Sequence, residues 1–179
     1  KRQIQYNLLM KKFLITYSTV DGHTKNICQK IADYSKSTQM DVLPISDVMD
    51  IKEYDFIVIG ASIRYGKYRK ELYDFISKNA EKLESKNNAF FSVNAVARKL
   101  EKNTPETNPY IIKFLKKIDW VPKKIEVFAG KIDYPNYKFF DKYVIKFIMW
   151  TSKGPTDTSK TYEFTDWNRV EAFSKNLNL

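Results

Sequence analysis

Cysteine, histidine and glycine are scarce in this chain of 179 residues, which has one cysteine, one histidine and five glycines. A single cysteine, Cys28, excludes a disulfide within the chain. Together with His23 it is also too few for a zinc site of cysteines and histidines or for a haem-attachment motif. We therefore expect no metal centre, and we favour the cell interior over an oxidising compartment.

Long apolar runs are also missing. No stretch reaches the roughly 18 uncharged apolar residues that span a bilayer. The N-terminus lacks the continuous apolar core and the small-residue cleavage site of a signal peptide. Residues 1–9 differ in character from the chain after Met10, so we interpret them as an extension. Residues 10–179 have a length that suits a single domain with one well-buried core.

Negative charge is in deficit, because 31 Lys and Arg residues face 21 Asp and Glu residues, which gives a net charge of +10. Such a surplus predicts attraction to an anionic partner, which is nucleic acid, an anionic membrane surface or an acidic substrate. Hydrophobic residues make up 43% of the chain, a composition typical of a globular protein.

Short apolar runs alternate with segments of helical spacing. The runs predict strands at residues 13–17, 56–59, 89–93 and 125–129, with a weaker candidate at 40–43. Helical spacing lies between them, at residues 27–32, 72–83 and 111–118. Near-continuous apolar runs are typical of parallel strands covered on both faces. We therefore predict an α/β fold with a doubly wound parallel sheet, with Cys28 as a core residue of the first helix.

The glycines gather where the predicted strands end. Gly22, Gly60, Gly66 and Gly130 all follow or close an apolar run. Open α/β sheets bind ligands at the carboxyl ends of their strands, so this placement favours a ligand site there. The alternative, that these connections need glycine only for their backbone geometry, stays open.

Residues 18–24 form a hydroxyl-rich loop between the first strand and the first helix. Backbone N–H groups at a helix N-terminus favour a phosphate group. The loop contains neither a Walker motif nor a Gly-x-Gly-x-x-Gly motif. Asp21 is unexpected beside a phosphate, and its alternative role is to cap the helix, which leaves Ser18, Thr19 and Thr24 to hold the anion.

Two further loops follow the next strands. Residues 60–68 offer Arg64 and Tyr65, and residues 92–99 offer Asn94 and the cations Arg98 and Lys99. Carboxyl ends of neighbouring parallel strands share one edge, so the three loops are expected to form one crevice. The first loop suits a phosphate and the other two suit a planar ring, whereas Arg64 and Arg98 remain open to interpretation as solvated surface charges. Tyr65 either contacts the ring or packs against the sheet.

Residues 131–159 form a basic, aromatic insert that breaks the strand–helix alternation. Between residues 131 and 154, five lysines face two aspartates. On a helix over residues 136–152, the cations Lys138, Lys142 and Lys146 form one stripe beside a wide arc that includes Phe139, Phe140, Phe147 and Trp150. This pattern predicts a helix at an anionic membrane surface. The alternative is a helix buried against the domain.

After the insert, residues 160–165 predict another strand, and Asp166 is the predicted N-cap of a last helix that begins at Trp167.

Several of these strings resemble a known family. Ser18-Thr19-x-Asp21-Gly22-x-Thr24 looks like the FMN phosphate loop of flavodoxins, although that loop more often has Thr at the position of Asp21. Longer strings resemble the flavodoxin-like, menaquinone-dependent protoporphyrinogen oxidases of bacteria, and these are Ile59-Gly-Ala-Ser-Ile-Arg-Tyr-Gly66, Phe91-Ser-Val-Asn-x-Val-Ala-Arg-Lys99, Thr104-Pro105, Thr156-Asp-Thr158 and Thr165-Asp-Trp167. The resemblance runs from about Met10 to the C-terminus.

The resemblance implies a flavodoxin-like, five-stranded sheet of order 2-1-3-4-5, with the insert interrupting the fifth strand region. It implies FMN as cofactor and oxidation of protoporphyrinogen IX to protoporphyrin IX in haem biosynthesis. Electrons would pass to a respiratory quinone, menaquinone or ubiquinone, at the cytoplasmic face of the inner membrane. The protein would be bound there peripherally, and no oligomeric state follows.

The resemblance also implies the site residues. The expected cofactor-binding residues are Ser18, Thr19, Asp21, Gly22, His23, Thr24, Ser62, Ile63, Arg64, Tyr65, Gly66, Ser92, Val93, Asn94 and Ala95. The expected counter-charges for the substrate's propionates are Arg64, Lys67, Arg98 and Lys99. No side-chain nucleophile is expected, because the redox chemistry belongs to the flavin.

Three other classes of function compete with this one. The main alternative is a flavodoxin-type electron carrier or another FMN-dependent quinone oxidoreductase. Electron carriers of this type generally have acidic docking faces, so the net charge of +10 counts against the first of these. A nucleic-acid-binding module rests on net charge alone, so no nucleic-acid partner is expected. A Ser-His-Asp hydrolase that uses His23 is disfavoured, because no partner pattern accompanies that histidine.

Overall fold

The computed structural model describes residues 11–35 and 39–177, so the predicted extension over residues 1–9 lies outside the described residues. Five parallel strands form the central sheet in the order β2-β1-β3-β4-β5. They are β1 (Phe13–Ser18), β2 (Met40–Pro44), β3 (Phe56–Ser62), β4 (Asn87–Val93) and β5 (Ile125–Phe128). The doubly wound parallel sheet and its strand order are confirmed.

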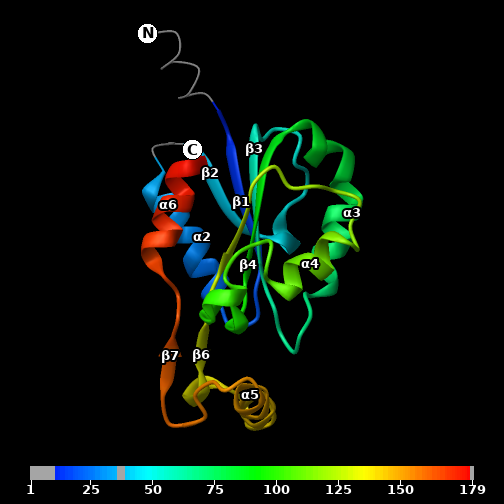
Figure 1. Cartoon of the computed structure of the whole chain (residues 1–179). Coiled ribbons are helices and arrows are strands. Elements are labelled where there is room, and N and C mark those ends of the chain that lie inside the picture. Colours follow the sequence, from blue (N-terminus) through cyan, green and yellow to red (C-terminus); the bar gives the residue numbers. More distant parts are fainter. Residues whose placement is uncertain (1–10, 36–38, 178–179) are drawn as a thin grey trace.

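Two pairs of helices cover the sheet, one pair on each face (Figure 1). Helices α2 (His23–Tyr34) and α6 (Trp167–Leu177) lie on one face, and α3 (Lys70–Ser85) and α4 (Pro109–Leu115) lie on the other. The Asp166 carboxylate accepts from the backbone N–H groups at the start of α6, as predicted. Helix α4 ends before Ile118, which its apolar spacing had included.

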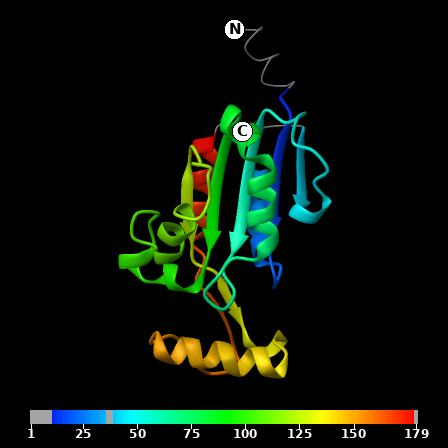
Figure 2. The same ribbon diagram turned by 90° about the vertical axis from the view of Figure 1, so that its right-hand side faces the viewer.

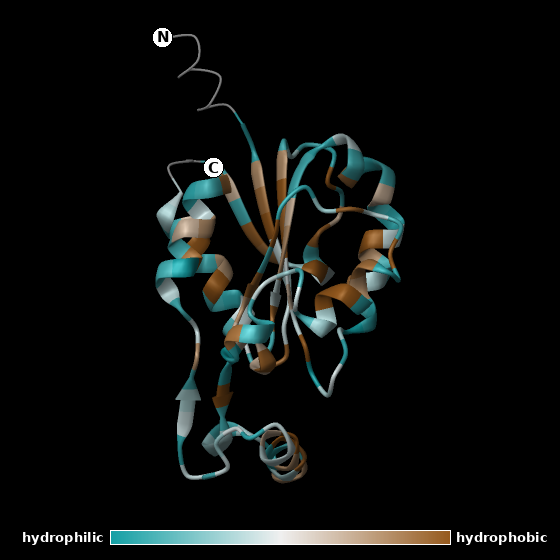
Figure 3. Cartoon of the chain, in the orientation of Figure 1, coloured by the Kyte–Doolittle hydropathy of each residue, from teal (hydrophilic) through white to brown (hydrophobic). Residues whose placement is uncertain are grey.

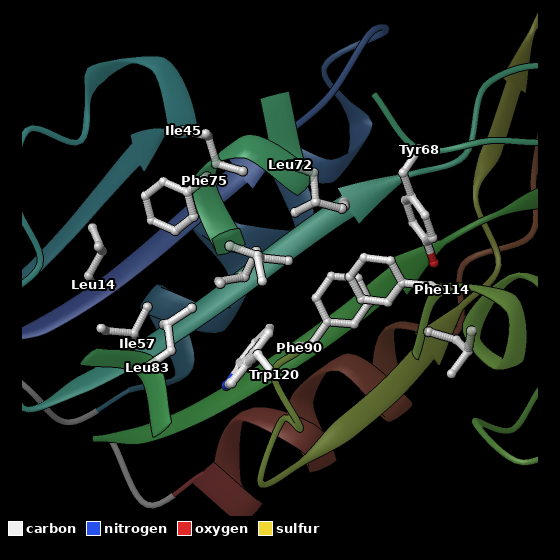
Figure 4. Close-up of a cluster of buried hydrophobic side chains, with 14 of the residues drawn as sticks. Leu14, Ile45, Ile57, Tyr68, Leu72, Phe75, Leu83, Phe90, Phe114 and Trp120 are labelled. Carbon is white, nitrogen blue, oxygen red and sulfur yellow. The ribbon is translucent and has the colours of Figure 1, made fainter. Parts of the chain in front are cut away.

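The core follows from the apolar runs, which appear brown along the central strands in Figure 3. Their side chains are buried on both faces of the sheet. On the side of α3 and α4, the Phe90 and Phe114 rings stack 4.6 Å apart beside the fully buried Trp120 (Figure 4). On the other side, Cys28 is fully buried in α2, so its predicted core role is confirmed. Burial raises the pKa of its thiol, which keeps it unreactive.

Gly60 lies inside β3, so the prediction that it closes the strand over residues 56–59 is wrong. A Cβ at this position would stand 2.3 Å from the ring of Phe91 on β4. Glycine is therefore required here by close packing between neighbouring strands rather than by loop flexibility.

The insert projects from the carboxyl edge of the sheet. Strands β6 (Lys131–Asp133) and β7 (Thr161–Glu163) pair antiparallel as a separate ribbon, which carries a short 3₁₀ turn, η4 (Tyr134–Asn136), and helix α5 (Phe139–Thr151). Helix α5 lies crosswise beyond the strand ends (Figure 2). It begins three residues later than the predicted helix over residues 136–152, because the turn η4 ends at Asn136 and the extended residues Tyr137 and Lys138 connect it to α5.

A small hydrophobic cluster attaches α5 to its ribbon. Ile145 and Met149 of α5 pack with Ile132, Tyr134 and Tyr137. The opposite side of the helix is open to solvent, and its exposed aromatic side chains are Phe139, Phe140, Tyr143, Phe147 and Trp150. The alternative of a helix wholly buried against the domain is therefore wrong, since only one side is covered.

Candidate functional site

A cleft of about 850 Å³, including the space open to solvent at its mouth, lies between the loops that follow β1, β3 and β4 and the inner side of α5. The cleft lies at the carboxyl ends of the parallel strands, where open α/β sheets bind ligands. Most of the predicted site residues line it, and these are Thr19, Asp21, His23, Thr24, Ser62, Ile63, Arg64, Tyr65, Gly66, Val93, Asn94, Ala95 and Arg98.

Three predicted cofactor residues support the cleft without lining it. Ser18 is buried and donates to Oε1 of Glu71 at 2.6 Å. Ser92 is buried and accepts from the hydroxyl of Tyr68 at 2.7 Å. Gly22 takes the N-cap position of α2 with a φ of 78°, a left-handed conformation that glycine adopts without strain.

Thr24 is the strongest sign of a ligand in the loop over residues 18–24. It is fully buried in the first turn of α2, and its Oγ1 has no hydrogen-bond partner among the described residues. Leaving a buried polar group unpaired costs about 1–3 kcal/mol. The first N–H groups of α2 also lack partners within the helix, and the helix dipole favours an anion beside them. The loop therefore suits a phosphate group.

Asp21 does not cap α2, so that alternative is wrong. No side-chain hydrogen bond caps the helix, and Oδ2 of Asp21 accepts from Nη1 of Arg64 at 2.6 Å. Burial raises the pKa of Asp21, and the neighbouring Arg64 charge opposes that rise. Nη2 of Arg64 lies 3.1 Å from Oδ2 of Asp141 on α5. Two carboxylates already compensate Arg64, which makes it a poor counter-charge for a substrate.

Tyr65 and Gly66 form a tight turn after β3. Their φ angles are 50° and 79°, and backbone hydrogen bonds between Arg64 and Lys67 close the turn. The Tyr65 hydroxyl donates to Oδ1 of Asp141, which lowers the pKa of that carboxylate. Tyr65 is 41% exposed and contacts α5, so the alternative in which it packs against the sheet is wrong.

A buried polar network shapes the loop after β4. The Asn94 amide group donates to Oγ of Ser92 at 3.0 Å, and its Oδ1 accepts from the N–H of Ala97 at 3.1 Å. Asn108 donates to the same Oδ1 at 3.2 Å. Asn94 thus caps the 3₁₀ turn η2 (Ala95–Arg98), and a satisfied network of this kind keeps the cleft wall rigid.

Arg98 ties this wall to the end of α5. Its Nη1 donates to the carbonyl of Ala95 at 2.7 Å, and its Nη2 donates to the carbonyl and hydroxyl oxygens of Ser152 at 2.9 and 3.1 Å. A Cβ on Gly154 would stand 2.8 Å from that Nη2, so glycine permits the close approach. Burial lowers the pKa of Arg98, and no carboxylate pairs with it among the described residues. It is not a solvated surface charge.

We expect Arg98→Ala to loosen α5 while the sheet keeps its stability. Each hydrogen bond from a charged group contributes about 1.5–3 kcal/mol, so amide hydrogen exchange in α5 is expected to accelerate roughly 10- to 150-fold. Arg98→Lys restores the charge without the planar fork, so it rescues only in part. Exchange in β3 and β4 serves as the internal control. Unchanged exchange in α5 contradicts this role.

His23 connects the loop over residues 18–24 to the segment after β7. Its Nε2 lies 2.7 Å from Oγ1 of Thr165, whose own hydrogen goes to the carbonyl of Ala129. His23 therefore donates through Nε2. Burial lowers the pKa of the ring, and no serine or aspartate is bonded to it among the described residues, so a hydrolytic triad has no support.

The sequence patterns did not assign ten of the lining residues to a site. Seven come from the insert, and three come from the loop after β1, the loop after β4 and α4; they are Lys131, Ile132, Tyr137, Ile145, Ile148, Met149 and Ser152, and Val20, Val96 and Tyr110. The spacing of Ile145 and Met149 placed them on one side of a helix. It could not show which part of a broad apolar arc faces the domain.

Comparisons with known proteins agree with this geometry. The flavodoxin domain model matches residues 14–159. Protoporphyrinogen IX dehydrogenase [quinone] of Escherichia coli (strain K12) is 44% identical over 170 residues, which cover 93% of this chain and 94% of that protein. The protein of the same name from Leishmania major is 42% identical over 172 residues, which cover 93% of this chain and 74% of that one.

Solved structures show the same fold at low identity. Flavodoxin 1 from Bacillus cereus has a TM-score of 0.52 and 15% identity, and the match covers 93% of this chain and 97% of that one. A flavodoxin from the domain Archaea has a TM-score of 0.50 and 14% identity, with coverage of 93% and 96%.

Proposed function

Because the chain belongs to the flavodoxin domain family, we propose that it is an FMN-dependent protoporphyrinogen IX dehydrogenase that passes electrons to a membrane quinone. One observation carries the proposal, which is the 44% identity to the Escherichia coli enzyme over 93% of this chain. An alignment of that length includes the insert as well as the sheet, so it covers both sides of the cleft.

The cleft fits FMN. The unpaired Thr24 hydroxyl and the free N–H groups of α2 would hold the phosphate. The loops over residues 62–66 and 94–98 would hold the ring, and the buried Asn94 network keeps the second loop in place. When bound, FMN would supply two-electron redox chemistry, so three turnovers would account for the six electrons of the overall reaction. The protein would supply binding and orientation, and its α5 residues Ile148 and Met149 line one side of the cleft.

Membrane association is the second part of the proposal. The aromatic side chains on the outer side of α5 form an exposed apolar face, and such faces mark interaction surfaces. Asp141 is bonded to Tyr65 and Arg64, and Asp133 is paired with Lys131. Lys138, Lys142 and Lys146 therefore form no ion pair with a carboxylate of this segment, and lysines so placed attract anionic lipid.

No helix within the described residues is long and apolar enough to cross a bilayer. The proposed mode of association is therefore peripheral, at the cytoplasmic face of the inner membrane, with α5 at the interface beside the quinone pool.

The test uses the purified protein with protoporphyrinogen IX and a menaquinone analogue under anaerobic conditions. We expect flavin absorption bands, formation of protoporphyrin IX seen by fluorescence, and quinone reduction that depends on the porphyrinogen. An electron carrier without its own substrate would show the flavin bands and form no porphyrin. That second result would contradict the proposed activity while leaving the flavin assignment intact.

A further inference from the structure

A second, smaller cavity adjoins the cleft. It has a volume of about 280 Å³, again including open space, and it shares Ile63, Gly66 and Tyr110 with the cleft. A small hollow beside the cleft is a place for one substituent of a larger molecule rather than for a whole cofactor.

The side cavity is basic with an aromatic wall. Lys67, Lys113 and Lys117 line it, and no acidic residue does. None of the three lysines forms an ion pair with a carboxylate of the described residues. The wall contains Phe114, whose ring lies 4.9 Å from that of Tyr68 (Figure 4). Three uncompensated cations beside apolar rings favour a carboxylate on an apolar stem.

The cations in the cleft itself are already engaged. The carboxylates of Asp21 and Asp141 compensate the charge of Arg64. Arg98 donates hydrogen bonds to the carbonyl oxygens of Ala95 and Ser152. Lys67 is thus the one expected counter-charge that lines the side cavity, and the structure adds Lys113 and Lys117 from α4 and the residues after it.

We propose that the side cavity binds a carboxylate side chain of the substrate through Lys67, Lys113 and Lys117, while the ring system of the substrate lies at the mouth of the cleft, beside the site proposed for FMN. This inference rests on the proposed function and specifies how the same site selects an acidic, ring-shaped substrate. Lys113 and Lys117 lie four residues apart and are the pair to test, because neither contributes to the phosphate loop or to the contacts of α5.

The test compares two double variants of equal charge. Lys113→Gln with Lys117→Gln alters the side cavity, whereas Lys78→Gln with Lys116→Gln alters exposed lysines that line neither cavity. Both lower the net charge by two, so long-range attraction of an acidic substrate falls equally. The measured quantities are KM and kcat for protoporphyrinogen IX, the dissociation constant of protoporphyrin IX from fluorescence titration, and FMN content.

We expect the side-cavity variant to raise KM and the porphyrin dissociation constant roughly 5- to 30-fold, as expected for two ion pairs made by exposed lysines, with FMN content unchanged. The control variant is expected to stay near wild type. The dimethyl ester of protoporphyrin IX has no free carboxylate, so wild type and the side-cavity variant are expected to bind it equally.

Two results would overturn the inference alone, given a wild-type protein that oxidises the porphyrinogen. One is a side-cavity variant with wild-type KM and porphyrin affinity. The other is an equal loss of affinity for the acid and for its ester. Wild-type protein that holds FMN but neither oxidises protoporphyrinogen IX nor binds the porphyrin would overturn the proposed function, and this inference with it.

Discussion

Replacing Phe147 and Trp150 with serine is expected to abolish sedimentation with anionic liposomes while FMN stays bound. These side chains are 62% and 68% exposed on the outer side of α5, so the change removes no core contact of the domain. Transfer of each large apolar side chain from water contributes about 1.5–3 kcal/mol, so the pair would weaken binding by more than about 100-fold. The measurements are liposome sedimentation and flavin absorption of the same preparation.

A matched control removes exposed apolar surface elsewhere. Met49 and Val121 are 90% and 75% exposed and lie far from α5 in sequence. Serine at both positions is expected to leave liposome binding at the wild-type level. Equal binding by wild type and by the Phe147 and Trp150 variant would contradict the interfacial role of α5.

Thr24→Val is expected to weaken FMN binding about 10- to 150-fold without destabilising the protein that lacks FMN. The change removes a hydroxyl that makes no hydrogen bond within the described residues, and a hydrogen bond to a charged phosphate contributes about 1.5–3 kcal/mol. Valine has nearly the shape of threonine, and loss of an unpaired buried hydroxyl favours the folded state. FMN titration by fluorescence and thermal melting of the FMN-free protein measure the two effects.

Thr16 provides the control for this prediction. Its Oγ1 is also buried and unpaired among the described residues, but it lies within β1 and does not line the cleft. Thr16→Val is expected to keep or raise thermal stability and to leave FMN affinity unchanged. If Thr24→Val behaves like Thr16→Val, the phosphate does not lie at the loop over residues 18–24.

The strands of the sheet could be predicted from the sequence, because a strand that is buried on both faces is a nearly continuous run of apolar residues. The apolar runs at residues 13–17, 56–59, 89–93 and 125–129 all became parallel strands. The hydroxyl residues and Gly22 directly after β1 predicted a loop at the N-terminus of α2. The first N–H groups of any helix lack partners within the helix, so this feature does not depend on distant parts of the chain. Asp166 likewise acts on N–H groups only a few residues away.

The partners of the charged side chains were beyond the reach of local patterns. Tyr65 is hydrogen-bonded to Asp141, which lies 76 residues away in the sequence, and Arg98 is hydrogen-bonded to Ser152, which lies 54 residues away. From the sequence alone, Arg64 and Arg98 were therefore predicted to be counter-charges for a substrate. The fold instead pairs Arg64 with two carboxylates and places Arg98 against the carbonyl oxygen of Ser152 at the end of α5.

The two sides of α5 differ for the same reason. The sequence predicts a helix with a broad apolar arc, but docking of the ribbon decides that Ile145 and Met149 face inward and that Trp150 faces solvent. Periodicity reports which residues share a face, and burial depends on what packs against that face. The fold class thus follows from spacing along the chain. The side of the cleft that α5 lines, and the basic side cavity, follow instead from contacts between distant segments.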